Sequence, residues 1–287
     1  MEPAVSYSSV SKVYRDFFLR ARVRTLDRFD LTIAPGETIG LIGPNGSGKS
    51  TAINLLVGLL KPSSGTVRLM GRDPREPSSR RELGYLPEEN ANYPFLTAHD
   101  AMWLHARVAG LSRNEARARC DELLERLGLA HARKRRAGTF SKGMGRRLGI
   151  AQALIAKPRV LVLDEPTTGL DPVGTRDVLE LFASLKRDGV TMLVSSHILS
   201  EIEGVCDRVV MLDHGRILKT GTTAEMLTLR DQHQVRFAGG GPDMANELEA
   251  WLKARGAEIL SSGHPTRSLA DVYRELLVDH KQGDKQS

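Results

Sequence analysis

Continuous apolar runs recur along the chain and predict strands that are buried on both faces of a sheet. They cover residues 38–42, 160–163, 191–195 and 209–212. Segments whose apolar residues lie three to four positions apart occur between them and predict helices at 50–60, 173–186 and 199–206. Because strands and helices alternate, we expect an α/β fold whose sheet is parallel or mixed.

The pattern changes to helical between about residues 88 and 158. Residues 97–108 and 114–127 both show helical spacing, and Gly128 follows the second segment as a typical helix end. This stretch is predicted to form a helical subdomain inserted into the α/β core. Residues 2–66 are instead rich in predicted strands and are expected to contain an antiparallel β subdomain at the N-terminus.

A small α/β appendix is expected at the C-terminus, after a main domain at residues 1–221. The appendix and its polar tail take residues 222–287. We predict a strand at 234–237 and a helix at 243–255, and residues 257–260 and 268–277 could repeat that pair. The appendix could clamp or regulate an assembly, or it could be a passive cap.

The composition fits a globular protein, because 40% of the residues are hydrophobic and 26% are charged. This excludes a disordered, collagen-like or disulfide-stapled chain. The apolar runs are much shorter than the roughly 20 residues of a membrane helix, and the first ten residues are polar, so we expect neither a span nor a leader. Cys120 and Cys206 lie far apart, which indicates a reduced intracellular protein. The net charge of +6 favours anionic partners without choosing among them.

Residues 43–51, Gly-Pro-Asn-Gly-Ser-Gly-Lys-Ser-Thr, form a glycine-rich loop between a predicted strand and a predicted helix. Glycines let the backbone wrap closely around a phosphate, and the N–H groups at a helix start attract it. The loop therefore predicts a polyphosphate site in which Lys49 neutralises the terminal phosphates and Ser50 ligates magnesium. The candidate nucleotide contacts are Gly43, Asn45, Gly46, Ser47, Gly48, Lys49, Ser50 and Thr51.

Two acidic residues, Asp164 and Glu165, directly follow the predicted strand at 160–163. In a parallel sheet, ligands collect at the carboxyl ends of the strands, where the loop of Lys49 also lies. Asp164 is expected to hold magnesium through water, and Glu165 to polarise the water that attacks the γ-phosphate. The two motifs together predict a P-loop NTPase core whose attacking water is directed at a γ-phosphate.

Further motifs occur in the order found in the ATP-binding subunits of ATP-binding-cassette (ABC) transporters, which the chain resembles over about residues 3–220. Residues 140–144, Phe-Ser-Lys-Gly-Met, stand where this family has its Leu-Ser-Gly-Gly-Gln signature, and a helix is predicted at 145–156. Asp171 ends a Gly-Leu-Asp segment that matches the loop facing the other subunit. His197 matches the switch histidine, and Tyr14 fits the aromatic residue that stacks on adenine.

The resemblance implies a head-to-tail pair of ATPase subunits, either a homodimer or a pseudo-dimer, with two ATP molecules between them. Ser141 and Gly143 open the signature helix, which in this family faces the ATP held by the partner's loop. Asp171 would couple the two sites. His197 would contact the γ-phosphate.

The resemblance also implies separate transmembrane permease subunits, docked on the helical subdomain. The chain would then sit at the cytoplasmic face of the cell membrane, bound through those subunits. ATP and Mg²⁺ are the expected cofactors, with Lys49, Glu165 and His197 as the catalytic residues. No specific nucleic acid is expected as a partner.

Three positions depart from the family pattern. Glu88 follows Leu-Pro where the family has Gln. Its oxygen can ligate magnesium as the amide oxygen does, but it repels the γ-phosphate when the metal is absent. Lys142 and Met144 replace Gly and Gln in the signature, and Lys142 either adds positive charge near the partner's ATP or is simply solvated. We expect hydrolysis to be intact.

The favoured function is the motor of an exporter, because of the Ser-Lys-Gly-Met signature and the ending at 268–273; an importer is the weaker alternative. The second class is a soluble cassette ATPase that acts on nucleic acid or ribosomes. The chain has one cassette, and the stretch from Lys49 to Ser141 is too short for long coiled coils. The third class is a nucleotide-binding regulator without turnover.

The basic run 133–136, with Arg146 and Arg147 nearby, is interpreted as a charged face of the helical subdomain rather than as a lipid or nucleic-acid site.

Overall fold

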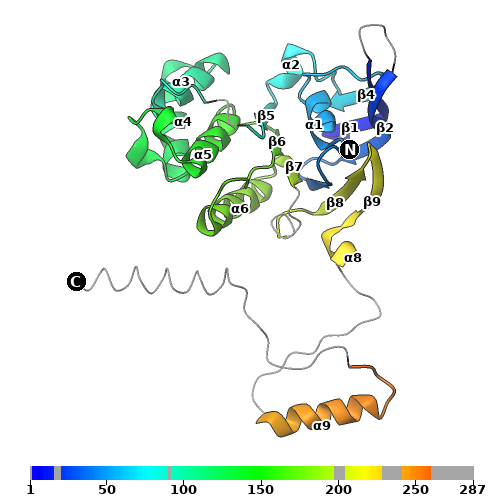
Figure 1. The fold of residues 1–287 in the computed structure, drawn as a ribbon. Coiled ribbons are helices and arrows are strands. Elements are labelled where there is room, and N and C mark those ends of the chain that lie inside the picture. The colour runs from blue at the N-terminus through cyan, green and yellow to red at the C-terminus, as the bar shows by residue number, and fades with distance from the viewer. Residues whose placement is uncertain (1, 16–20, 90–91, 197–203, 228–240, 260–287) are drawn as a thin grey trace, which may run out of the picture. The chain divides into compact units, whose positions relative to one another are not determined.

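The computed structural model describes residues 2–15, 21–89, 92–196, 204–227 and 241–259 (Figure 1). The chain divides into two compact units, Met1–Leu227 and Thr228–Ser287. The first unit contains two sheets and a group of helices. The second unit is described through one helix.

The smaller sheet of the first unit is antiparallel, with strand order β2-β1-β4. Its strands are β1 (Val5–Arg15), β2 (Ala21–Ile33) and β4 (Ser64–Leu69). The predicted N-terminal antiparallel β subdomain is therefore confirmed. The great length of β1 and β2 was not predicted, because polar residues interrupt their apolar pattern.

The larger sheet has the strand order β5-β6-β7-β3-β8-β9. Its strands are β3 (Thr38–Ile42), β5 (Leu83–Leu86), β6 (Val160–Asp164), β7 (Thr191–Ser196), β8 (Arg208–Asp213) and β9 (Arg216–Thr222). All neighbours pair in parallel except β8 and β9, which pair antiparallel. The mixed sheet of an α/β fold is thus confirmed, and β3 and β6 end at the same edge, on either side of β7.

Each central strand is buried on both faces because successive side chains enter two different cores. In β6, Val160 and Val162 belong to the core formed with the small sheet and α1 (Lys49–Leu56). Leu161 and Leu163 belong to the core that continues into the helices. This is why these strands appear in the sequence as continuous apolar runs.

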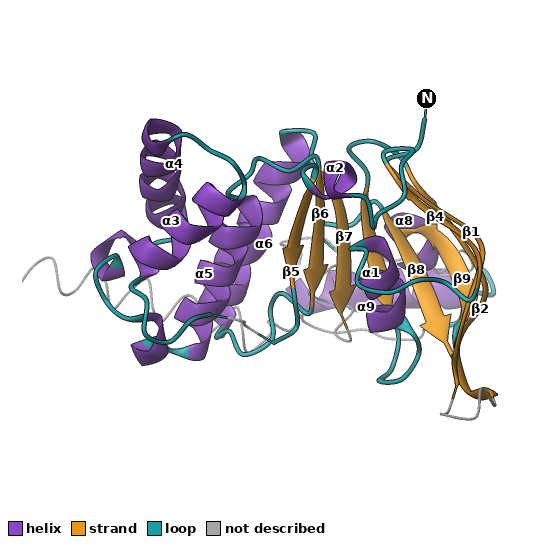
Figure 2. Ribbon diagram, turned by 90° about the horizontal axis from the view of Figure 1, so that it is seen from above, coloured by secondary structure: helices purple, strands orange, loops and turns teal. Residues whose placement is uncertain are grey.

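The helical subdomain contains α3 (Ala98–Val108), α4 (Arg113–Arg126) and α5 (Lys142–Leu154), with short 3-10 turns at Ala130–Ala132 and Ala137–Thr139. Figure 2 shows these helices beyond the β5 edge of the large sheet. Side chains cap each helix start: Thr97 for α3, Ser112 for α4 and Ser141 for α5. The predicted insertion of a helical subdomain is confirmed.

The remaining helices of the first unit are α2 (Pro77–Arg80), α6 (Pro172–Arg187) and α8 (Thr223–Leu227). The predicted helix at 50–60 is too long, because α1 ends at Leu56 and the chain turns at Gly58, whose φ is 76°. A Cβ at Gly58 would lie 2.4 Å from the carbonyl oxygen of Pro74, so this close turn requires glycine. Most of the helix predicted at 199–206 lies outside the described residues.

The second unit contains α9 (Gly241–Lys253), which matches the helix predicted at 243–255. The predicted segments 234–237 and 268–277 lie outside the described residues, and residues 257–259 are not in a strand. Among the described helices of both units, none combines the length and the apolar composition that crossing a membrane requires.

Candidate nucleotide-binding site

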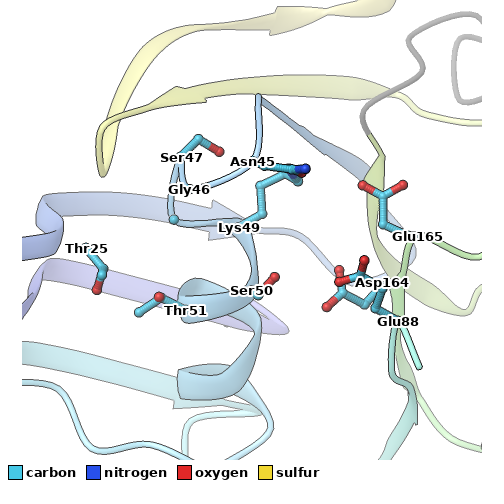
Figure 3. A pocket seen from close by; sticks show the side chains of 11 residues that line it. Thr25, Asn45, Gly46, Ser47, Lys49, Ser50, Thr51, Glu88, Asp164 and Glu165 are labelled. Carbon is cyan, nitrogen blue, oxygen red and sulfur yellow. The ribbon is translucent and has the colours of Figure 1, made fainter. Parts of the chain in front are cut away.

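One cavity of about 150 Å³ brings the two predicted motifs together (Figure 3). Its lining residues are Thr25, Asn45, Gly46, Ser47, Gly48, Lys49, Ser50, Thr51, Glu88, Asp164 and Glu165. The loop after β3 and the start of α1 form one wall, and the ends of β5 and β6 supply the acids of the other. Figure 3 shows Glu88, Asp164 and Glu165 on the side facing Lys49 and Ser50.

Two glycines of the loop after β3, Gly43 and Gly48, are packed so closely that they have no room for a side chain. A Cβ at Gly43 would lie 2.2 Å from the carbonyl oxygen of Leu212. Gly48 has a φ of 110°, and its Cβ would lie 2.6 Å from the carbonyl oxygen of Thr25. The loop apex is fixed by the N–H of Gly215, which donates to the carbonyl of Ser47 at 2.8 Å.

The start of α1 contributes positive electrostatic potential to the cavity. The first N–H groups of a helix have no partner within it, and here they belong to Lys49, Ser50 and Thr51. The Nζ of Lys49 donates to the carbonyls of Gly43 at 2.6 Å and Pro44 at 3.2 Å, with only 6% of the residue exposed. The ammonium group is therefore held within the loop that would wrap a phosphate.

The opposite wall carries negative charge that the protein only partly balances. Burial raises the pKa of Asp164, and the nearby carboxylates of Glu88 and Glu165 raise it further. A hydrogen bond from Ser195 and the charge of Lys49 act in the opposite direction. The wall is consequently suited to a cation.

The side chains present fit Mg²⁺ and a polyphosphate. The hydroxyl of Ser50 and the carboxylates of Glu88 and Asp164 are the oxygen ligands that Mg²⁺ prefers, and Mg²⁺ usually completes its shell with waters and phosphate oxygens. Within the described residues, no group of three or more acidic, His or Cys side chains is already arranged around a metal position. The buried Oγ of Ser47 has no hydrogen-bond partner, so the glycine-rich loop also contains an unsatisfied polar atom.

Other predicted site residues do not line this cavity. Tyr14 lies on β1, is 42% exposed, and has the Nζ of Lys12 at 5.2 Å from its ring centre. Ser141 caps α5 by accepting from the N–H of Met144 at 3.2 Å, and Asp171 caps α6 by accepting from the N–H of Gly174 at 2.6 Å. His197 lies outside the described residues.

The signature segment and the loop of Asp171 are packed against each other. A Cβ at Gly143 would be 3.3 Å from the Cδ2 of Leu170, and a Cβ at Gly169 would be 3.5 Å from the Cβ of Lys142. The two loops thus form adjacent parts of one surface. The signature helix begins earlier than predicted, at Lys142 instead of Gly145, because Ser141 supplies its cap.

Three residues at the site were not predicted from the sequence, and the first, Thr25, lines the cavity from β2. Ser195 was noted only as a neighbour of His197, but its hydroxyl bonds to Asp164. Arg146 was assigned to a charged surface, and that assignment is wrong, because only 1% of the residue is exposed. It lies four positions before Ile150 on the apolar stripe of α5, a position that could have indicated its burial.

The guanidinium of Arg146 is buried against the acidic wall. Burial lowers its pKa to about 10, while the charges of Asp164, Glu165 and Glu88 oppose that change. Arg146 therefore keeps its positive charge at neutral pH. In the basic run, by contrast, Arg133 pairs with Asp121 at 2.6 Å and Arg135 lies 5.7 Å from the ring centre of Phe140.

Comparison with known proteins decides the family. The profile of the family described as "ABC transporter" matches residues 26–168. The doxorubicin resistance ATP-binding protein DrrA of Mycobacterium tuberculosis is 39% identical over 273 residues, which cover 94% of this chain and 80% of that protein. The chain belongs to the ABC transporter family. It is an ATP-binding subunit of that family and an ATP hydrolase.

Solved structures agree with this ABC fold. An ATP-binding subunit of an ABC transporter superposes with a TM-score of 0.70 at 32% identity and covers 78% of this chain and 91% of its own. A dimeric ATP-binding cassette in a post-hydrolysis state, bound to ADP and Pi, gives a TM-score of 0.70 at 26% identity, with 76% and 98% covered. ATP binding and the P-loop NTPase fold are thereby confirmed, and the nucleic-acid alternative is not favoured.

Proposed function

We propose that this ABC subunit powers an exporter, working as a head-to-tail dimer on separate membrane subunits. One observation carries the proposal: residues 45–51 of the loop and the three acids Glu88, Asp164 and Glu165 line the same cavity. A polyphosphate bound by the loop would have its terminal phosphate directed at the acids.

The loop and Lys49 bind the phosphates. The N–H groups at the start of α1 point toward the anion, and the ammonium of Lys49 exchanges its carbonyl partners Gly43 and Pro44 for phosphate oxygens. This exchange keeps a buried charge paired throughout. Tyr14, exposed on β1, supplies a surface on which adenine stacks.

The acids prepare the attacking water. Glu165 accepts a proton from the water as it approaches the γ-phosphate, which makes Glu165 the general base. Ser50, Asp164 and Glu88 would hold Mg²⁺, which would supply positive charge to the phosphate oxygens. His197 contacts the γ-phosphate in this proposal, as the family resemblance implies.

The dimer completes each site. Ser141 caps α5, a helix of 13 residues that begins at Lys142 and contains Gly143 in its first turn, and the first N–H groups of this helix would bind the partner's ATP. Asp171 lies in the adjacent loop and couples the two sites. The dimeric state of a related cassette supports this arrangement.

Membrane subunits dock on the helical subdomain. Tyr93 and Phe95 are 47% and 68% exposed, and their ring centres lie 5.9 Å apart, which provides an apolar surface for a partner. The carbonyl of Pro94, between them, accepts from the N–H of Gly138 at 3.0 Å, shortly before Ser141. Docking at this surface would therefore act on the signature. It would also hold the chain at the cytoplasmic face of the membrane.

Export of drug-like molecules is supported by the name of the doxorubicin resistance relative.

The role of Glu165 is tested by comparing Glu165→Gln with wild type in an ATPase assay and in light scattering with ATP and Mg²⁺. We expect kcat to fall by roughly 10²–10⁴-fold, the usual contribution of a general base. We also expect the variant to accumulate as an ATP-bound dimer, because hydrolysis no longer separates the subunits.

Glu89→Gln is the matched control, since it removes the same charge from an exposed residue that does not line the cavity. Equal activity of wild type and Glu165→Gln would disprove the role of Glu165. Export is tested in a doxorubicin-sensitive host by co-expression with a candidate membrane subunit from the neighbouring reading frames. Survival must be lost with Glu165→Gln if export is the function.

A further inference from the structure

One buried side chain of the signature helix holds together the backbone around the catalytic acids. Arg146 lies in the second turn of α5, and its guanidinium donates to five main-chain carbonyls. These belong to Pro87, Glu88, Asp164, Glu165 and Pro166, at 2.6–3.1 Å where the contact is of ordinary length. A guanidinium has five N–H donors, and each is used.

The five acceptors come from two segments that are far apart in the sequence. Pro87 and Glu88 follow β5, whereas Asp164, Glu165 and Pro166 end β6 and continue beyond it. Arg146 is thus the point at which α5, the loop of Glu88 and the end of β6 are tied together. Figure 3 shows that the side chains of the tied acids face the cavity.

The backbone of Glu165 adopts a conformation that needs such support. Its φ is +50°, in the left-handed region that residues with a side chain rarely occupy. The N–H of Glu165 donates to the Oγ of Ser195 at 3.0 Å, and its carbonyl accepts from Arg146 at 2.6 Å. The peptide groups on both sides of the unusual φ are therefore anchored.

We propose that Arg146 is a positioning residue for Glu165. By fixing the carbonyls of residues 164–166, it directs the Glu165 carboxylate toward the attacking water. The same contacts carry displacements of α5, which Ser141 caps, to the acids. This inference rests on the proposed role of Glu165 as general base.

A lysine cannot take over this role. Its three donors radiate from a single nitrogen, whereas the guanidinium spreads five donors over a rigid plane that reaches both segments. Arg146→Lys keeps the positive charge and most of the volume but loses the simultaneous contacts. It therefore separates the positioning function from charge and packing.

The test measures KM and kcat for ATP with the full chain carrying Arg146→Lys, and the Kd of ATP by titration. We expect kcat to fall on the order of 10–100-fold, because a displacement of about 1 Å at a reacting group costs that much. The Kd and KM of ATP should change less than about threefold, since the loop 43–51 makes no contact with Arg146 in the bonds described. An unchanged kcat would overturn the proposal.

Arg119→Lys is the matched control. The guanidinium of Arg119 also donates to a carbonyl of α5, that of Leu154 at 2.9 Å, but at the end of the helix remote from the cavity. Its kcat should equal that of wild type. If the lysine variant at 146 lowers kcat no more than this control does, Arg146 is merely structural.

A second variant, Arg146→Ala, leaves a cavity of guanidinium shape. Added methylguanidinium should restore part of the kcat of Arg146→Ala, and it should leave the kcat of Arg119→Ala unchanged. Failure to rescue a folded Arg146→Ala protein would contradict the proposal.

Failure of the positioning role of Arg146 can be distinguished from failure of the proposed role of Glu165. If Glu165→Gln is as active as wild type, the general base is wrong; if Glu165→Gln is inactive but Arg146→Lys is fully active, only the positioning role is wrong.

Discussion

The hydroxyl of Ser195 donates a hydrogen bond to the carboxylate of Asp164. The two residues are direct partners in the parallel pairing of β7 with β6, so the register of the sheet brings them together. The same hydroxyl oxygen accepts the N–H of Glu165 at 3.0 Å. One buried serine therefore holds the carboxylate of Asp164 and the backbone of Glu165, two of the three acids of the site.

Ser195→Ala is expected to lower both stability and turnover. It leaves the buried N–H of Glu165 without its acceptor, and an unsatisfied buried donor costs about 1–3 kcal/mol of unfolding free energy. It also removes the donor that orients Asp164, so kcat for ATP should fall. Urea unfolding and steady-state ATPase assays measure the two effects.

Thr191→Val is the control, because Thr191 begins the same strand and its Oγ1 accepts the N–H of Gly36 at 2.9 Å, away from the cavity. The control should lose a similar amount of stability and keep its kcat. Were both variants to show the same kcat, the hydroxyl of Ser195 would have no role in orienting the acids.

The pH dependence of stability should reveal the buried carboxyl of Asp164. Its pKa is raised in the folded chain, so between its ordinary value and the raised value the folded state binds the proton more tightly than the unfolded state. The unfolding free energy of the nucleotide-free protein therefore falls as pH rises through this interval. Asp164→Asn removes that contribution.

Urea unfolding of wild type and Asp164→Asn over a series of pH values provides the measurement. The stability of the variant relative to wild type should increase with pH and become constant above the folded pKa. Asp177→Asn, on an exposed position of α6, should instead give a curve parallel to wild type. A parallel curve for Asp164→Asn would show that its carboxyl is not destabilised by burial.

The sequence allowed the central strands and the cavity walls to be predicted because both signals are local. Residues 39–42 and 160–163 carry no polar side chain, and the loop with Lys49 and the pair Asp164 and Glu165 directly follow them. Parallel pairing then brings both strand ends to one edge. Predicting the two walls of the cavity therefore required no knowledge of the residues that pack around them.

The supporting residues depend on contacts between distant segments and could not be found in this way. Thr25 reaches the cavity through the packing of β2 on α1, and Ser195 through the register of β7 with β6. Arg146 occupies an apolar stripe, but its acceptors are main-chain carbonyls, which no side-chain pattern reveals. Sequence patterns therefore indicated the reacting groups more completely than the residues that hold those groups in place.

Glu88 should weaken the binding of ATP when magnesium is absent. Its carboxylate lines the same cavity as Asp164 and contributes to the raised pKa of that residue, so it adds to the negative charge that a phosphate meets. Glu88→Gln removes this repulsion. We expect ATP affinity in EDTA to rise roughly 3–10-fold, about 1 kcal/mol, which is the size of one partly solvated charge interaction.

Calorimetric titration with EDTA and with Mg²⁺ measures the effect. In Mg²⁺ the affinity should change little, because an amide oxygen can also ligate the metal. Glu89→Gln should change the affinity in neither condition, since Glu89 is exposed and lies outside the cavity lining. An equal gain for both variants would mean that only net charge matters.

Gly48 and Gly46 provide a test of how tightly the phosphate loop is packed. Both have positive φ values, 110° and 80°, so alanine at either position costs about 1–2 kcal/mol in backbone strain. A Cβ at Gly46 meets nothing within 4 Å, whereas at Gly48 it lies 2.6 Å from the carbonyl oxygen of Thr25. Gly48→Ala must therefore also displace β2 or α1. Urea unfolding without nucleotide should show a clearly larger loss for Gly48→Ala than for Gly46→Ala, and equal losses would mean that the contact with β2 does not constrain the loop.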